Sequence, residues 1–188
     1  MNHPIRIVVT DDLRRSRLTV FFRLLLAIPH WIWMYLWGLA AFVVVVIAWF
    51  AALFTKRVPE GMHGFLARYL RYQIHVYAYV TLAANPYPAF DGSRAYPIDV
   101  EIAPPVDQSR LTVFFRIVLA LPALFLSYVM NYLVGVVVLF AWFVCMFLGR
   151  IPEGMRNLIA FTLRYHAQTQ AYCSLLTPTY PSLNVGLE

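Results

Sequence analysis

Arginine is the residue type in this sequence with the clearest chemical potential, because it recurs at matched positions 93 residues apart. A guanidinium group presents five N–H donors and keeps its charge at physiological pH, which suits it to bind phosphate or carboxylate. Two interpretations stay open: the arginines bind the headgroups of anionic phospholipids, or they anchor the membrane topology with side chains that reach out of the bilayer. The candidate headgroup-binding residues are Arg17, Arg23, Arg57, Arg71, Arg110, Arg116, Arg150 and Arg164.

The acidic residues shared by both halves are better suited to helix capping than to catalysis. Glu60 and Glu153 each follow a proline at the start of a predicted helix, where a negative charge favours the positive end of the helix dipole. We expect them to stabilise these helix starts or to pair with Arg57 and Arg150. The histidines lack the close helical spacing of a metal site, and no phosphate loop or nucleophile motif is present. The sequence therefore predicts no catalytic residue, no metal and no cofactor.

A tandem duplication positions these residues. The stretch SRLTVFFR occupies 16–23 and returns at 109–116, and 35 of the 89 positions are identical when 4–92 is laid on 97–185. A fixed internal period of this kind indicates a repeated structural unit. The sequence predicts two repeats, residues 1–93 and 94–188, each with a strand, a membrane hairpin and an amphipathic helix in that order.

The composition indicates a membrane protein. Hydrophobic residues make up 61% of the chain and charged residues 13%, against about 45–50% and about 25% in soluble domains. The net charge is +6, yet no lysine or arginine lies in 24–55 or 117–149. A nucleic-acid-binding protein would gather its basic residues in a patch or on a helix face. The predicted partner is therefore the lipid bilayer, through charge attraction to anionic headgroups, and not nucleic acid.

Each apolar run, 18–54 and 111–148, is too long for one crossing, which needs about 20 helical residues. It could form an in-plane helix followed by one crossing, broken at Pro29 or Pro122, or it could form a hairpin of two crossings. Basic residues at both ends of each run favour the hairpin, because cytoplasmic loops are enriched in lysine and arginine. Gly38 and Asn131 are the expected turn residues. The predicted membrane helices are 16–36, 39–55, 109–129 and 132–148.

The remaining segments complete the predicted fold. Residues 4–10 and 96–102 favour two strands that pair into a small sheet. Residues 62–83 and 155–176 favour amphipathic helices in the cytoplasmic interface. The expected fold is an α-helical integral membrane protein: a tandem repeat of two helical hairpins (four transmembrane helices), two interfacial amphipathic helices and a small cytoplasmic β element. Both termini are expected in the cytoplasm, with a pseudo-twofold axis along the membrane normal.

Four motifs recur in both halves: RLTVFFR, then AxP, AWF and RxPxGM. In this combination the chain resembles an uncharacterised family of bacterial membrane proteins, a domain of unknown function often present in two copies. The resemblance covers nearly the whole chain. It implies a location in the bacterial cytoplasmic membrane, and it assigns no catalytic residue.

Three functions are compatible with these observations. The first is a non-enzymatic membrane scaffold or accessory subunit, part of a homo-oligomer or of a larger membrane complex. The second is an oligomeric pore or carrier, with a path lined by Ser127, Asn131, Tyr35 or Tyr128. The third is an anionic-lipid-binding or lipid-handling protein that uses the shared arginines.

Overall fold

The computed structural model describes residues 3–92 and 96–183, and the predicted boundary between the repeats, at 93/94, lies outside them. Within the described residues the two halves have the same order of elements, except that the counterpart of the long helix of the first half is divided into two helices in the second half. The elements are β1 (Ile5–Val9), α1 (Arg17–Thr55), α2 (Glu60–Val80), β2 (Ile98–Ile102), α3 (Arg110–Phe114), α4 (Arg116–Leu148) and α5 (Glu153–Cys173).

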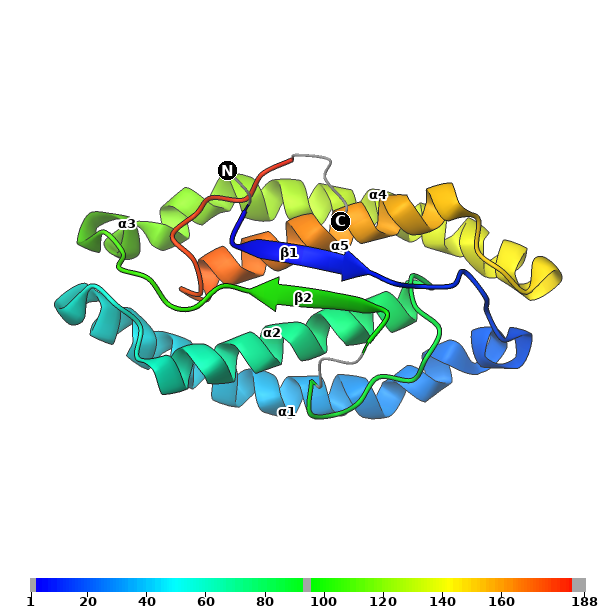
Figure 1. Cartoon of the computed structure of the whole chain (residues 1–188), viewed down its shortest axis with the longest axis horizontal. Coiled ribbons are helices and arrows are strands. Elements are labelled where there is room, and N and C mark those ends of the chain that lie inside the picture. Colours follow the sequence, from blue (N-terminus) through cyan, green and yellow to red (C-terminus); the bar gives the residue numbers. More distant parts are fainter. Residues whose placement is uncertain (1–2, 93–95, 184–188) are drawn as a thin grey trace.

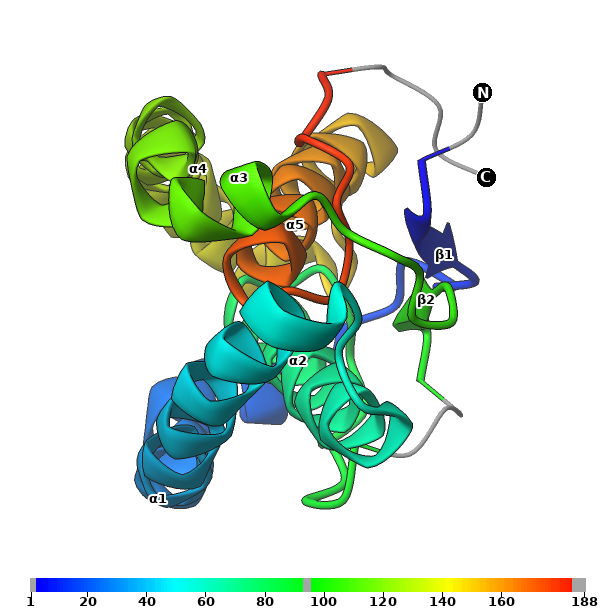
Figure 2. The same ribbon diagram turned by 90° about the vertical axis from the view of Figure 1, so that its left-hand side faces the viewer.

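The elements form three layers. Figure 1 shows the two strands across the middle of the long axis, in front of α2 and α5, with α1 and α4 behind. The view turned by 90° in Figure 2 separates the layers: α1 and α4 lie on one side, α2 and α5 in the centre, and the strands on the opposite side. The helical content and the small sheet agree with the predicted class of fold.

The predicted hairpins are wrong. Residues 17–55 form a single helix of 39 residues, and 116–148 form a single helix of 33 residues after the short helix α3. The outer limits were predicted well, since α1 and α3 begin directly after Ser16 and Ser109, and the long helices end at Thr55 and Leu148. Only the internal turns are missing, so the described residues contain two long apolar helices in place of four.

Both expected turn residues have other roles inside a continuous helix. Gly38 allows a close approach, because a Cβ atom there would lie 2.6 Å from the hydroxyl of Tyr69 on α2. The Asn131 side chain donates a hydrogen bond of 2.8 Å to the carbonyl of Ser127, one helical turn earlier. A side-chain bond to the i−4 carbonyl is compatible with an unbroken helix.

The amphipathic helices begin two residues earlier than predicted, and they form the central layer. Their apolar stripe is buried in the main core, with Leu66, Leu70 and Ile74 on α2 and Ile159 and Leu163 on α5. Both helices are packed on two sides, because the long helices cover one face and the sheet covers the other. Burial of these stripes supplies the hydrophobic stabilisation of the central layer.

The two strands pair as predicted and reveal the symmetry of the fold. β1 and β2 are antiparallel, and Ile7 lies opposite Val100, its own counterpart in the second repeat. A pseudo-twofold axis consequently passes between these two residues, perpendicular to the sheet. The alternation in β2 is also confirmed, since Ile98 and Val100 are buried while Glu101 is exposed.

Hydrogen bonds that cross between the repeats obey the same axis. The indole of Trp142 donates to the carbonyl of Val20 at 3.1 Å, and the indole of Trp49 donates to that of Val113 at 2.9 Å. These four residues are two matched pairs at the offset of 93. The α1/α4 layer is therefore joined at both of its ends by equivalent contacts.

Candidate functional site

The largest candidate site is the outer surface of α1 and α4, which we call the apolar layer. In the part of the chain that the structure describes, all but six of the exposed large apolar side chains lie in 17–55 and 110–148. The exceptions are Tyr87, Phe90, Val106, Leu158, Tyr180 and Leu183. A soluble monomer rarely exposes a contiguous apolar patch above a few hundred Å², so a surface of this kind marks contact with a membrane or a partner.

Most of the buried positions of each long helix hold small residues. On α1 the fully buried positions include Ala27, Ala48 and Ala52, and α4 repeats the pattern with Ala120 and Ala141. The large apolar side chains point elsewhere. Only 17% of the most apolar 18-residue stretch of each helix is buried, whereas the core helix of a soluble protein is mostly buried. Among the described residues, α1 and α4 are the two helices long and apolar enough to cross a membrane.

Exposed basic residues stand at both ends of the apolar layer. Arg17 and Arg150 lie at the end where α1 begins and α4 ends, while Arg57 and Arg110 lie at the opposite end. Each end is fixed by a backbone hydrogen bond between the repeats. The Arg15 N–H donates to the carbonyl of Gly149 at 2.9 Å, and at the other end the Gln108 N–H donates to the carbonyl of Lys56 at 2.7 Å. The four exposed arginines of the predicted set are thus divided into two equivalent pairs.

Arg23 and Arg116 do not belong to a headgroup-binding ring, because both side chains are 2% exposed. The Arg116 Nη1 donates to the carbonyls of Tyr172 and Thr177 at 2.7 and 3.0 Å, and its Nη2 donates to Gln108 Oε1 at 2.6 Å. The guanidinium also lies 4.4 Å from the centre of the Tyr172 ring. The cation adds a donor to carbonyls at and just beyond the end of α5, and its charge complements the negative end of that helix dipole.

Arg23 makes the equivalent clamp on α2. Its Nη1 donates to the carbonyls of Tyr79 and Ala84 at 2.7 and 3.1 Å, and its guanidinium lies 4.5 Å from the centre of the Tyr79 ring. The recurrence of these arginines in both halves therefore has a structural cause: each ties the start of a long helix to the end of the following helix.

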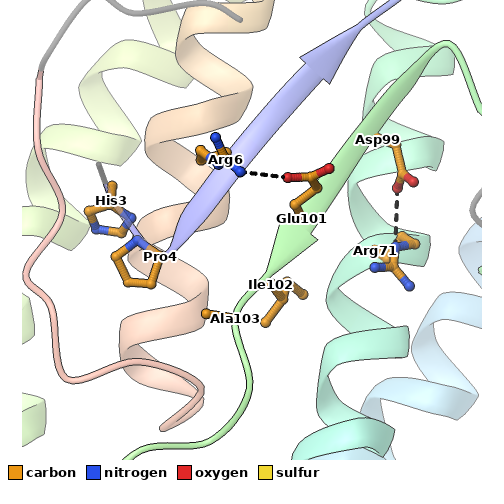
Figure 3. A pocket seen from close by; sticks show the side chains of 8 residues that line it. All are labelled: His3, Pro4, Arg6, Arg71, Asp99, Glu101, Ile102 and Ala103. Atoms are coloured by element: carbon orange, nitrogen blue, oxygen red, sulfur yellow. Dashed lines mark hydrogen bonds and ion pairs between the residues drawn. The ribbon is translucent and has the colours of Figure 1, made fainter. Parts of the chain in front are cut away.

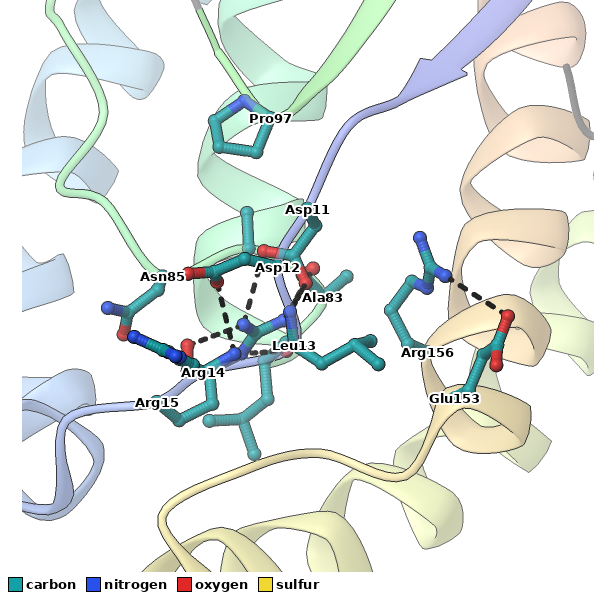
Figure 4. A network of polar contacts seen from close by, with 12 residues as sticks. Asp11, Asp12, Leu13, Arg14, Arg15, Ala83, Asn85, Pro97, Glu153 and Arg156 are labelled. Carbon is teal, nitrogen blue, oxygen red and sulfur yellow. Dashed lines mark hydrogen bonds and ion pairs between the residues drawn. The ribbon is translucent and has the colours of Figure 1, made fainter.

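A second buried arginine supports the clamp of the first repeat. Arg15 is 3% exposed and forms an ion pair with Asp11, at 2.7 Å between Nη2 and Oδ2. It also donates to the carbonyls of Leu82 and Ala83 at 2.8 Å each (Figure 4). The matched residue, Gln108, donates to the carbonyl of Leu175 at 2.7 Å. The prediction overlooked both residues, since Arg15 and Gln108 differ in type and identity between repeats was the criterion.

The predicted acidic residues lie at the helix starts. Glu60 and Glu153 are the first residues of α2 and α5. Glu60 lies 3.7 Å from Arg57, whereas Glu153 lies 3.8 Å from Arg156 and not beside Arg150. Both carboxylates are largely exposed, so these ion pairs contribute little to stability.

Arg71 and Arg164 face away from the apolar layer. Arg71 lines a pocket of about 700 Å³ beside the sheet, together with Asp99, and its Nε lies 3.1 Å from Asp99 Oδ1 (Figure 3). The same carboxylate oxygen is 2.9 Å from His75 Nε2. Arg164, on α5, is 6% exposed, with its guanidinium 5.3 Å from the ring centre of Phe161.

The rest of the pocket combines a second ion pair with apolar residues, so the charges of the lining residues balance. An ion pair of 3.0 Å joins Arg6 on β1 to Glu101 on β2, with both side chains about half exposed. The remaining lining residues are His3, Pro4, Ile102 and Ala103. The outward alternation of charged residues in 98–102 was the signal for this pocket, although it did not indicate which helix would supply the partner arginine.

The residues predicted to line an oligomeric pore lie at two kinds of position in the single chain. Ser127 Oγ and Asn131 Nδ2 lie 3.2 and 3.4 Å from His166 Nδ1, at the contact between α4 and α5. Tyr35 and Tyr128, by contrast, are 67% and 72% exposed on the apolar layer. Burial lowers the pKa of His166 to about 4, so this histidine is neutral near pH 7.

Fold and surface together define a mostly helical protein with a two-stranded sheet and two candidate membrane-spanning helices. A family model, described as a domain of unknown function (DUF4389), matches the chain twice, over residues 17–91 and 110–183. The chain belongs to this family, and the two matches confirm the resemblance to a duplicated domain of unknown function. No curated protein and no solved structure matches the chain.

Proposed function

We propose that this protein is a non-enzymatic membrane scaffold or accessory subunit, held in the bacterial cytoplasmic membrane by its apolar layer. The observation that carries the proposal is the division of the surface: the exposed large apolar side chains lie in residues 17–55 and 110–148, with only six exceptions among the described residues. The opposite side presents a sheet and a charged pocket to water. Such a molecule can hold a folded, water-exposed surface next to the membrane.

The use of the polar residues supports a scaffold over an enzyme. The deeply buried arginines bind backbone carbonyls, as Arg23, Arg116 and Arg15 do, and so they stabilise the packing of helices. Asp99 forms an ion pair with Arg71 and lies within hydrogen-bond distance of His75. The Arg71 guanidinium donates to the carbonyl of Val100, so these contacts join the sheet to α2. These groups are committed to contacts that hold the three layers together.

Fractionation and native mass spectrometry test the proposal. We expect the protein to stay with the membrane pellet after washing with alkaline carbonate, which strips peripheral proteins. In a mild detergent we expect a mass above that of the 21.7 kDa chain, from self-association or from a co-purifying subunit. A protein that is soluble without detergent would refute membrane embedding, and a strictly monomeric particle with no partner would refute the scaffold.

Anionic-lipid binding is a second candidate, favoured by the exposed arginines at the ends of the apolar layer. Native mass spectrometry in phosphatidylglycerol tests it. We expect Arg57→Gln combined with Arg150→Gln to lower the number of retained phosphatidylglycerol molecules. The matched control is Arg68→Gln, which removes an exposed arginine from the middle of α2. Equal retention by both variants would exclude these arginines as headgroup sites.

A further inference from the structure

We propose that the apolar layer lies in the plane of the membrane, immersed in a single leaflet, with the sheet facing water on that same side. This inference rests on the proposed membrane function and specifies its geometry. The occupant of the apolar surface is thus the hydrocarbon of one leaflet, and neither long helix crosses the bilayer. Three independent observations support this arrangement: helix length, the position of the charges and the direction of the pseudo-twofold axis.

Helix length is the first. The stretches without aspartate, glutamate, lysine or arginine, 24–55 and 117–148, have 32 residues each, or about 48 Å of helix at 1.5 Å per residue. The hydrocarbon core is only about 30 Å thick. A crossing that buried the whole stretch would need a tilt of about 50°, beyond the usual range of up to about 40°. One helix layer is about 10–12 Å thick, so it fits within a leaflet of about 15 Å.

The position of the charges is the second. The sheet lies halfway along the molecule (Figure 1), and the exposed ion pair between Arg6 and Glu101 lies on it. If the long axis stood along the membrane normal, this pair would lie at the level of the bilayer centre, where ionised side chains are costly. With the long axis in the membrane plane, the pair lies in water, two layers away from the lipid. Charge varies across the layers of the molecule and not from one end to the other.

The symmetry is the third. The axis between Ile7 and Val100 is perpendicular to the sheet, and the layers are stacked along the same direction. An in-plane apolar layer places this axis along the membrane normal, so the two equivalent ends meet the same leaflet. Arg17 and Arg150 at one end, and Arg57 and Arg110 at the other, then reach the headgroups of that leaflet. Their charge complements anionic lipid, and all four satisfy the positive-inside tendency on the cytoplasmic side.

Site-directed labelling tests the orientation on the full chain in membrane vesicles. Ser16 and Ser109 are a matched pair: both are exposed, both precede a helix, and neither side chain caps it. Each becomes a single cysteine in a background where Cys145→Ala and Cys173→Val introduce the residue types found at the matched positions of the first repeat. We expect a membrane-impermeant maleimide to label both positions from the same face of the membrane. Labelling from opposite faces would overturn the proposal.

Depth measurements separate an in-plane helix from a re-entrant hairpin, which would also return both ends to one side. A polarity-sensitive fluorophore is placed at Leu25, Leu36 or Ile47, all exposed along α1, and is quenched by lipids carrying nitroxides at different depths. We expect similar depths within one leaflet at all three positions. A deepest position at Leu36, close to the bilayer centre or beyond it, would refute the in-plane arrangement. Absence of the protein from the membrane fraction would instead refute the proposed function itself.

Discussion

Replacing Arg116 tests whether the recurring buried arginines are structural clamps or lipid-binding residues. The substitution Arg116→Met keeps an apolar stem and removes the guanidinium, which donates to two carbonyls and to Gln108 Oε1. Hydrogen bonds to charged groups contribute about 1.5–3 kcal/mol each, but several share one guanidinium and its desolvation opposes them. We expect the free energy of unfolding to fall by about 3 kcal/mol, with the acceptors around Tyr172 and Thr177 left without their donor.

Thermal unfolding in a mild detergent, followed by tryptophan fluorescence, measures this loss. For a chain of this size about 1 kcal/mol shifts the Tm by about 2–4 °C, so we expect a fall of about 6–12 °C. The matched control is Arg150→Met, an exposed arginine that should change the Tm by less than about 2 °C, in line with surface substitutions. The clamp in the first repeat predicts a comparable loss for Arg23→Met. If Arg116→Met unfolds at the temperature of the Arg150→Met control, the structural assignment is wrong.

Three further predictions follow from single contacts. Because burial lowers the pKa of His166 from 6.5 to about 4, the unfolded chain binds more protons than the folded chain between these pH values. The free energy of unfolding should therefore fall by about 2–3 kcal/mol as the pH drops from 6.5 to 4. Urea unfolding midpoints should show this pH dependence in the unsubstituted protein and lose it in His166→Gln. Lys56 has a left-handed backbone (φ 66°) at the position where the second repeat has Gly149 (φ 68°). Lys56→Gly should therefore raise the free energy of unfolding by about 1 kcal/mol, and Gly149→Lys should lower it by a similar amount. If denaturation curves show both substitutions changing the free energy of unfolding in the same direction, the conformational explanation is wrong. Trp142→Phe removes the indole donor between the repeats and should cost about 1 kcal/mol in the same assay, as should Trp49→Phe; two unaffected midpoints would show that these bonds do not stabilise the layer.

Local features of the fold were largely predictable. The β-branched residues of 4–10 and the alternation of 96–102 indicated the two strands, and the pairing of Ile7 with Val100 follows the predicted relation between repeats. The outer limits of α1 and of the segment formed by α3 and α4 were also readable, because each apolar run ends at a basic residue or at the left-handed cap provided by Gly149. These signals are local, so they survive in any tertiary arrangement. The break between α3 and α4 at Phe115 was not predicted.

The hairpins failed because the same local signal has two physical causes. Gly38 indicated a turn, yet its missing side chain makes room for the hydroxyl of Tyr69 on another helix. Asn131 indicated a helix end, yet its amide bonds to the carbonyl of Ser127 within the helix. Run length alone favoured two crossings, yet a helix longer than the hydrocarbon core can also tilt or lie in the membrane plane.

The candidate site, too, was only partly predictable from the sequence. The arginines were chosen as candidates because they recur at matched positions 93 residues apart, which indicates a role common to both repeats. Repetition could not show that Arg23 and Arg116 are buried against helix ends, that Arg71 faces Asp99 beside the sheet, or that Arg17 and Arg57 are exposed at opposite ends of the apolar layer. The sequence by itself determined the duplication, the apolar character and the residue types at matched positions. Only the tertiary structure decided which arginine donates to backbone carbonyls, which pairs with a carboxylate and which is exposed. The environment of each side chain depends on how helices and strands from distant parts of the chain pack around it.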